Sequence, residues 1–121
     1  MRILVVEDDP LILEFASEAL REAGYEVTTA SDGHQALDQC KQRTADFLVT
    51  DIRLPGDISG WEIAEECRKH DPDLPVIYAS GFSPVPARPV PGSVCLAKPY
   101  RPEDLVKAIE KLSGSNAPHR H

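Results

Sequence analysis

Five short apolar segments recur along the chain, and each one ends at polar or turn-forming residues. Most of them are nearly continuous in apolar residues, which is the pattern of strands buried on both faces of a sheet. The second alternates apolar and polar residues and is typical of a strand with one exposed face. The predicted strands cover residues 2–6, 25–29, 47–51, 75–79 and 94–97.

Between these segments, apolar residues recur every three or four positions, which is the spacing of an amphipathic helix. The first helix is expected to begin at Pro10 behind Asp9 and to end at Gly24, because aspartate caps helices, proline suits their first position and glycine ends them. Three more helices are expected within residues 31–40, 61–70 and 102–112. Strands that alternate with helices predict an α/β fold, a doubly wound parallel sheet with helices on both faces.

One interval breaks this alternation. Residues 82–93 contain four prolines, and no regular helix survives prolines at that density. The fourth helix of the fold, which belongs between Ser80 and Lys98, is therefore expected to be short or missing. By its length the chain forms one domain, predicted at residues 1–113, with a flexible tail at 114–121.

Composition narrows the classes of partner. The formal net charge of −7 argues against nucleic acid and anionic membranes, because both attract basic surfaces. No apolar run approaches membrane-spanning length and no secretory segment opens the chain, so we expect a cytoplasmic protein. The three cysteines, Cys40, Cys67 and Cys95, are widely spaced in apolar contexts, which favours reduced thiols over disulfides or a zinc site.

Polar side chains follow four of the five predicted strands. Glu7 and Asp8 follow the first strand, Asp51 ends the third, Ser80 follows the fourth and Lys98 follows the fifth. The carboxyl ends of parallel strands share one edge of the sheet, where sites form. Three carboxylates need a cation to coexist, and Mg²⁺ prefers such oxygen ligands together with phosphate. A lysine and a hydroxyl can contact phosphoryl oxygens, so the set predicts a phosphoryl-transfer site.

In order and spacing, four motifs resemble the receiver domain of bacterial two-component response regulators. They are Val-Val-Glu-Asp-Asp at 5–9, Thr-Asp-Ile-Arg-Leu-Pro-Gly at 50–56, Tyr-Ala-Ser-Gly at 78–81 and Lys-Pro-Tyr at 98–100. The resemblance covers residues 2–112 and implies a flavodoxin-like sheet of five strands in the order 2-1-3-4-5. It implies a phosphoprotein of a phosphorelay whose partners are a histidine kinase, or a hybrid kinase or phosphotransferase, and an unknown downstream protein.

The resemblance also assigns roles to the acids. Asp51 would accept the phosphoryl group from a phosphohistidine. Asp8, Asp51 and the backbone carbonyl of Arg53 would bind Mg²⁺, or another divalent cation such as Mn²⁺, and Glu7 would act through water. A receiver assists only its own phosphorylation and dephosphorylation, so we expect no enzyme in the ordinary sense.

Lys98 takes the place of the lysine that contacts the phosphoryl group, and Ser80 takes the place of the family's switch residue. The switch position three residues before Lys98 usually carries an aromatic ring, and here it is Cys95. Residues 75–82 also resemble the receiver subgroup nicknamed FAT GUY, in which the fourth helix is weakened. We therefore expect phosphorylation to reorganise the loop at 81–92.

Two other functions compete with the phosphoacceptor. A degenerate receiver would act only as a protein-binding scaffold, and the small residue at Cys95 leaves this open. A phosphohydrolase with an aspartyl intermediate would favour Asp-x-Asp after the first strand, whereas the chain has Glu7-Asp8-Asp9 there. No output domain follows the last predicted helix, so we expect a stand-alone receiver that binds a partner or acts as a phosphoryl sink.

Overall fold

Nine helices and strands make up the described parts of this computed structural model, which comprise residues 1–42, 45–81 and 88–114. Strands and helices alternate up to β4. In chain order the elements are β1 (Arg2–Val6), α1 (Pro10–Glu22), β2 (Glu26–Ala30), α2 (Gly33–Gln42), β3 (Phe47–Asp51), α3 (Gly60–His70), β4 (Val76–Ser80), β5 (Val94–Ala97) and α4 (Pro102–Gly114).

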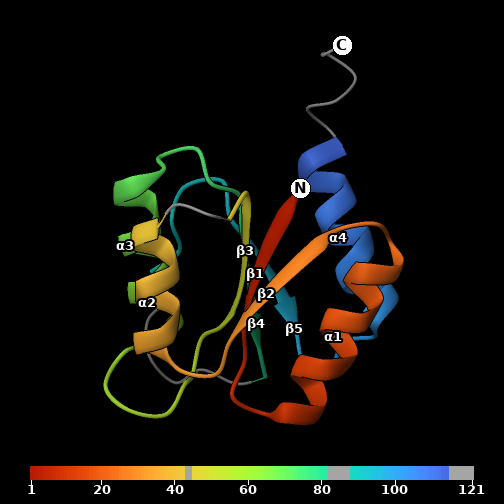
Figure 1. The fold of residues 1–121 in the computed structure, drawn as a ribbon, viewed down its shortest axis with the longest axis horizontal. Coiled ribbons are helices and arrows are strands. Elements are labelled where there is room, and N and C mark those ends of the chain that lie inside the picture. The colour runs from red at the N-terminus through yellow and green to blue at the C-terminus, as the bar shows by residue number, and fades with distance from the viewer. Residues whose placement is uncertain (43–44, 82–87, 115–121) are drawn as a thin grey trace.

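The five strands form one parallel sheet in the order β2-β1-β3-β4-β5, as the resemblance implied. Helices α2 and α3 cover one face of the sheet, and α1 and α4 cover the other (Figure 1). Successive residues of a strand point to opposite faces. Leu4 and Leu48 accordingly lie in the core under α2 and α3, while Ile3 and Phe47 lie in the core under α1 and α4.

The expectation of a short or missing fourth helix is wrong. Within residues 1–42, 45–81 and 88–114 the structure has four helices, and the fourth in chain order, α4, stands where the last helix was predicted and runs for 13 residues, as many as α1. Pro102 stands at its first position, where the fixed φ of proline suits a helix, and Leu105 and Ile109 anchor it in the core. Residues 82–87 of the proline-rich interval, and residues 115–121 of the predicted tail, lie outside the described residues.

The last part of the proline-rich interval, residues 88–93, lies against α3. Arg68 of α3 donates to the carbonyls of Leu74 at 2.7 Å and Pro91 at 2.8 Å. The backbone N–H of Val90 donates to the buried hydroxyl of Tyr78 on β4 at 3.1 Å. These bonds hold residues 88–93 to the outer side of β4 without a helix.

The prediction of separate cysteine thiols is also wrong for two of the three residues. Cys40 of α2 and Cys67 of α3 are joined in a disulfide, with their Cα atoms 5.0 Å apart. Sequence spacing hides this pair because 27 residues separate the two positions, and only the packing of α2 on α3 brings them together. Cys95 on β5 is a free cysteine, as predicted, and is exposed.

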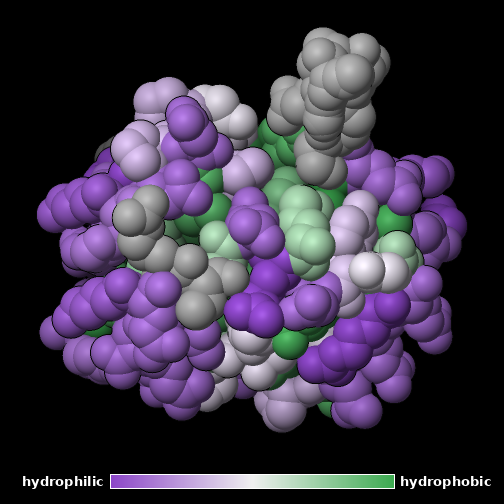
Figure 2. All heavy atoms as spheres, turned by 45° about the horizontal axis from the view of Figure 1, so that its top comes forward, coloured by the Kyte–Doolittle hydropathy of each residue, from purple (hydrophilic) through white to green (hydrophobic). Residues whose placement is uncertain are grey.

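The surface in Figure 2 is mostly hydrophilic. Figure 2 shows that hydrophilic side chains cover most of one face, with hydrophobic ones visible mainly in the strip between the helical layers. In the ranges that the structure describes, no helix combines the length and apolar character needed to cross a bilayer.

Candidate functional site

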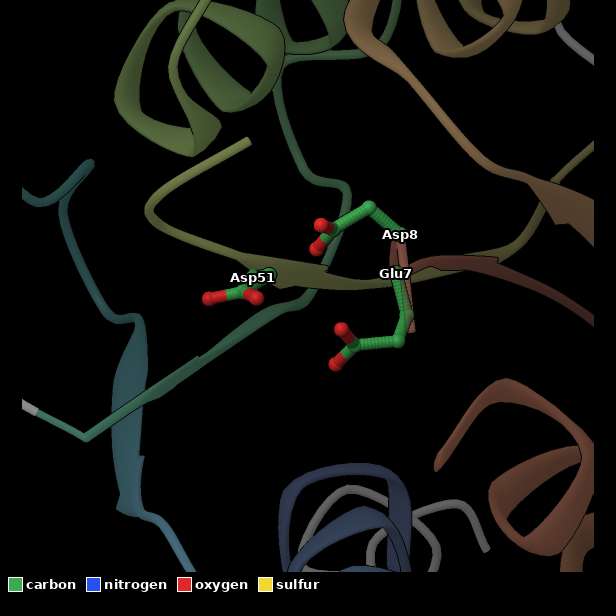
Figure 3. A group of neighbouring side chains, drawn as sticks. All are labelled: Glu7, Asp8 and Asp51. Carbon is green, nitrogen blue, oxygen red and sulfur yellow. The ribbon is translucent and has the colours of Figure 1, made fainter. Parts of the chain in front are cut away.

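The acids predicted from the sequence meet at the carboxyl ends of β1 and β3. Glu7 and Asp8 follow the last residue of β1, and Asp51 is the last residue of β3. Each of the three offers a carboxylate oxygen, and these oxygens all lie within 4.8 Å of one another. Figure 3 shows the three side chains reaching toward a shared space at the edge of the sheet. We call Glu7, Asp8, Asp51 and the neighbouring Lys98 the acidic rim.

Local backbone contacts hold Glu7 in place. Its N–H donates to the carbonyl of Ala30 at the end of β2 at 3.1 Å, which extends the strand pairing by one residue. Its Oε2 accepts the N–H of Asp9 at 3.1 Å. Asp9 in turn caps α1 by accepting from the N–H of Leu11 at 2.9 Å. The turn from β1 into α1 therefore buries Glu7, which is 4% exposed, and leaves Asp8 at the surface.

Lys98 connects the acids of β1 and β3. Its Nζ lies 2.7 Å from Oε1 of Glu7 and 3.0 Å from Oδ2 of Asp51. The lysine directly follows β5 at the edge of the sheet, and its peptide bond to Pro99 is cis. The sequence placed Lys98 at the same edge of the sheet as the acids. The structure brings this side chain between Glu7 and Asp51 and shows the cis form.

The pKa values of the Glu7 carboxyl and the Lys98 ammonium respond differently to burial. Burial raises the pKa of the Glu7 carboxyl, and the bonds from Lys98 and from Asp9 only partly oppose this. Burial lowers the pKa of the Lys98 ammonium, yet its bonds to Glu7 and Asp51 and their charges outweigh burial and raise it overall. The acids thus keep Lys98 charged, while Glu7 loses more by leaving water than it gains from one lysine. A second cation would favour ionised Glu7.

The rim fits a divalent cation by its donor set and by its charge. Three ionised carboxylates beside one ammonium leave two negative charges without compensation among the described neighbours. Carboxylate oxygens are the ligands that Mg²⁺ prefers, and Mg²⁺ keeps positions for water and phosphate oxygens. Asp8 is exposed, so solvent reaches the space between the acids.

The residues after Asp51 are held by a contact that the sequence did not reveal. The N–H of Gly60 donates to the carbonyl of Ile52 at 2.8 Å, and the backbone of Gly60 packs directly on the carbonyl of Asp51. Any side chain at residue 60 would overlap that oxygen. The sequence pattern placed the helix within residues 61–70 and left Gly60 outside it. The available signal was a glycine directly behind the capping residue Ser59, where a helix start does not otherwise need one.

Three other predicted residues occupy different places. The N–H of exposed Arg53 donates to Oδ1 of Asp51 at a long 3.4 Å, so its backbone is near the rim. Ser80 ends β4 and pairs with Ala97, the residue before Lys98, so its backbone lies at the same edge. Cys95 pairs with Tyr78, two residues inside the end of β5, and is exposed. None of these positions tests the resemblance to the FAT GUY subgroup, which stays a prediction.

Comparisons with known proteins agree with this geometry. The profile of the response regulator receiver domain matches residues 3–110. The chain is 36% identical over 115 residues to the response regulator receiver protein CpdR of Brucella abortus (strain 2308), across 92% of this chain and 95% of that protein. It spans about half the length of several longer relatives that are transcriptional regulatory proteins.

Solved structures give the same result. A response regulator receiver protein from Sinorhizobium medicae WSM419 superposes with a TM-score of 0.87 at 33% identity, over 93% of each chain. The response regulator protein TrrA of Thermotoga maritima, solved in complex with Mg(2+)-BeF, superposes with a TM-score of 0.79 at 35% identity, over 92% of this chain and 97% of that one. Fold, acidic rim and relatives agree, and the chain belongs to the response regulator receiver domains, the phosphoacceptor modules of two-component signal transduction.

Proposed function

We propose that Asp51 is the phosphoacceptor of this receiver and that the acidic rim carries out the transfer. The observation that carries the proposal is the convergence of the three carboxylates with Lys98, whose Nζ lies 3.0 Å from Asp51. A carboxylate held at a strand end beside a fixed positive charge is positioned to act as a nucleophile on a phosphoryl group.

In the proposed transfer, an oxygen of Asp51 attacks the phosphorus atom of a phosphohistidine. A P–O bond forms, the P–N bond breaks, and the imidazole nitrogen keeps the electron pair and takes up a proton. Hydrolysis reverses the modification, because water attacks the phosphorus atom and returns Asp51 as a carboxylate with inorganic phosphate. The protein contributes orientation and charge compensation to both steps, and it turns over no other substrate.

The other residues of the acidic rim, and two residues beside it, have separate roles in the proposal. Asp8, Asp51 and the backbone carbonyl of Arg53 would bind Mg²⁺, or Mn²⁺ in its place, with Glu7 acting through water, and the cation would supply charge neutralisation at the phosphoryl oxygens. Lys98 leaves its bond with Asp51 for a phosphoryl oxygen when the acid is modified. Ser80 takes the place of the family's switch residue, and in that role its hydroxyl would donate to another phosphoryl oxygen.

The phosphodonor is proposed to be a histidine kinase, or a hybrid kinase or phosphotransferase, as is general for receiver domains. We propose that the phosphodonor docks at an apolar groove beside Lys98. The groove holds a cavity of about 290 Å³, lined mainly by α1 and residues 98–102. Phe15 of α1 lines this groove and is 59% exposed. The proposal places the protein in the cytoplasm, and it includes no contact with nucleic acid or membrane.

Acetyl phosphate with Mg²⁺, followed by intact mass measurement, tests the proposal. We expect one phosphoryl adduct on the unaltered chain and none on Asp51→Ala. Asp57→Ala is the matched control, because Asp57 is an exposed acid in the loop that follows β3 and lies outside the rim. Chelation of the cation is expected to abolish the adduct, because the rim acids repel the incoming phosphate without it.

The other functions give different results. No adduct on the unaltered chain in excess Mg²⁺ would mean a scaffold that has lost the chemistry. An adduct that persists in Asp51→Ala would mean that another residue accepts the phosphoryl group. Continuous phosphate release at enzymatic rates would indicate a phosphohydrolase. The decay of the adduct separates the two outputs, because a short lifetime suits a phosphoryl sink and a long one suits binding to a downstream protein.

A further inference from the structure

The disulfide between Cys40 and Cys67 lies outside the acidic rim and serves no step of phosphoryl transfer. Cys40 stands in the last turn of α2 and Cys67 in the last turns of α3, at the helix ends opposite those that adjoin the strand carboxyl ends. Both helices cover the same face of the sheet, side by side (Figure 1). The bond therefore joins two neighbouring helices within one layer.

Packing brings the two cysteines together. Their Cα atoms are 5.0 Å apart, within the range that a disulfide spans without backbone movement. Cys40 is 5% exposed and Cys67 is 4% exposed, among apolar residues such as Leu4 and Leu48. The cavity that they line measures only about 20 Å³, room for little more than one water molecule. A reagent thus reaches the pair only when the helix ends open transiently.

We propose that Cys40 and Cys67 are a redox modification site, a reversible disulfide that fastens α2 to α3 and raises the resistance of this layer to local unfolding. The pair reacts by thiol–disulfide exchange with a low-molecular-weight disulfide such as oxidised glutathione. The thiolate of one cysteine attacks the reagent to form a mixed disulfide and releases one reduced thiol. The second cysteine attacks the mixed disulfide, forms the Cys40–Cys67 bond and releases the other reduced thiol, so the protein loses two electrons and two protons.

Burial sets the pace of this exchange. Cys40 and Cys67 are buried among apolar side chains, so a reagent meets them only after local opening of the helix ends. Exposed Cys95 lacks this protection and serves as an internal comparison within the same chain. We therefore expect Cys95 to be alkylated first in the native protein, and Cys40 and Cys67 to respond on the slower time scale of local opening.

The test uses the full chain, equilibrated with mixtures of reduced and oxidised glutathione, quenched with an alkylating reagent and then denatured. Under reducing mixtures we expect three alkylated thiols, and under oxidising mixtures a species in which Cys40 and Cys67 are blocked and joined in one disulfide-linked peptide after digestion. With Cys95 alkylated beforehand, the oxidised protein is expected to melt about 10 °C above the reduced one, from the size of the closed loop. Amide exchange in α2 and α3 is expected to slow by roughly a hundredfold in the oxidised form.

The double variant Cys40→Ala with Cys67→Ala is the matched control. Its melting temperature is expected to be the same at every ratio of reduced to oxidised glutathione. Two results would overturn the inference. One is full alkylation of Cys40 and Cys67 at every ratio tested, which would leave them as neighbouring thiols. The other is a disulfide that forms without raising the melting temperature or slowing exchange in α2 and α3. The adduct on Asp51 is a separate readout, so neither result bears on the proposed phosphorylation.

Discussion

A methyl group at residue 60 is expected to disturb both the stability of the fold and its acidic rim. Gly60 opens α3 with a backbone that packs on the end of β3. An ideal Cβ there would overlap the carbonyl oxygen of Asp51 and lie 2.9 Å from both the carbonyl carbon of Asp51 and Cα of Ile52. All three atoms belong to the backbone, so no side chain can turn aside to make room. In Gly60→Ala, α3 and β3 must therefore move apart.

The loss of stability in Gly60→Ala can be estimated. Overpacking of a buried site costs about 1–3 kcal/mol, and a clash with the backbone of a central strand belongs at the upper end of that range. Alanine favours a helix over glycine by at most about 1 kcal/mol, which offsets part of the cost. We expect Gly60→Ala to lower the free energy of unfolding by about 2 kcal/mol. With a urea dependence of about 2 kcal/mol per molar, the midpoint of unfolding falls by about 1 M.

Urea unfolding followed by tryptophan fluorescence measures this change. Trp61 is the single tryptophan of the chain, directly follows Gly60 and packs on Tyr78 with ring centroids 4.5 Å apart. Its emission therefore reports on the start of α3. A titration with Mg²⁺ in the same instrument is expected to show weaker binding by Gly60→Ala, because displacement of α3 also moves the Ile52 carbonyl and the loop behind Asp51.

Gly81→Ala is the matched control for this variant. A Cβ at residue 81 would meet only the Cβ of Lys98, at an ordinary contact distance of 3.8 Å. We expect its urea midpoint to stay within about 0.3 M of that of the unaltered protein, since surface substitutions mostly change stability by less than about 0.5 kcal/mol. Equal midpoints for the two alanine variants would refute the argument that Gly60 is required by close packing.

Two further predictions concern the protonation of the acidic rim and the docking of a histidine kinase beside it. Because burial raises the folded-state pKa of Glu7 above its ordinary value of 4.5, the stabilisation from its bound proton is fully present below that value and is lost as pH rises through the higher folded value. Urea midpoints of the metal-free protein are thus expected to fall over this interval, and a slope unchanged in Glu7→Gln would contradict the assignment. Phe15→Ala is expected to slow phosphorylation by a histidine kinase about tenfold through lost apolar contact, and to leave phosphorylation by acetyl phosphate unchanged. Val94→Ala, an exposed apolar residue outside that groove, is the control, and equal slowing in both variants would argue against docking at the groove.

Much of the fold follows from local pattern. The predicted bounds of β1, β3 and β5 match the structure, and β4 is displaced by one residue. Asp9 caps α1 and Pro102 opens α4 as expected, since both act through the backbone of their own first turn. The acids and Lys98 could be placed together because parallel strands deliver their carboxyl ends to one edge. The expectation of a short or missing fourth helix is wrong for the described residues, because their fourth helix is α4, the one predicted at residues 102–112, and it is full length.

Other features depend on contacts between elements that are distant in the sequence. The disulfide of Cys40 and Cys67 exists because α2 packs on α3, and nothing in the spacing of the two cysteines shows how those helices are turned. The requirement for glycine at residue 60 comes from the approach of α3 to the end of β3.

The sequence by itself determined the elements, their alternation in a doubly wound sheet and the acids at its edge, because periodicity and strand-end chemistry are local properties. Tertiary structure alone decided that Lys98 lies between Glu7 and Asp51, that burial raises the pKa of Glu7, and that two cysteines meet. The physical reason is that distance, burial and charge coupling arise only when separate segments pack against one another.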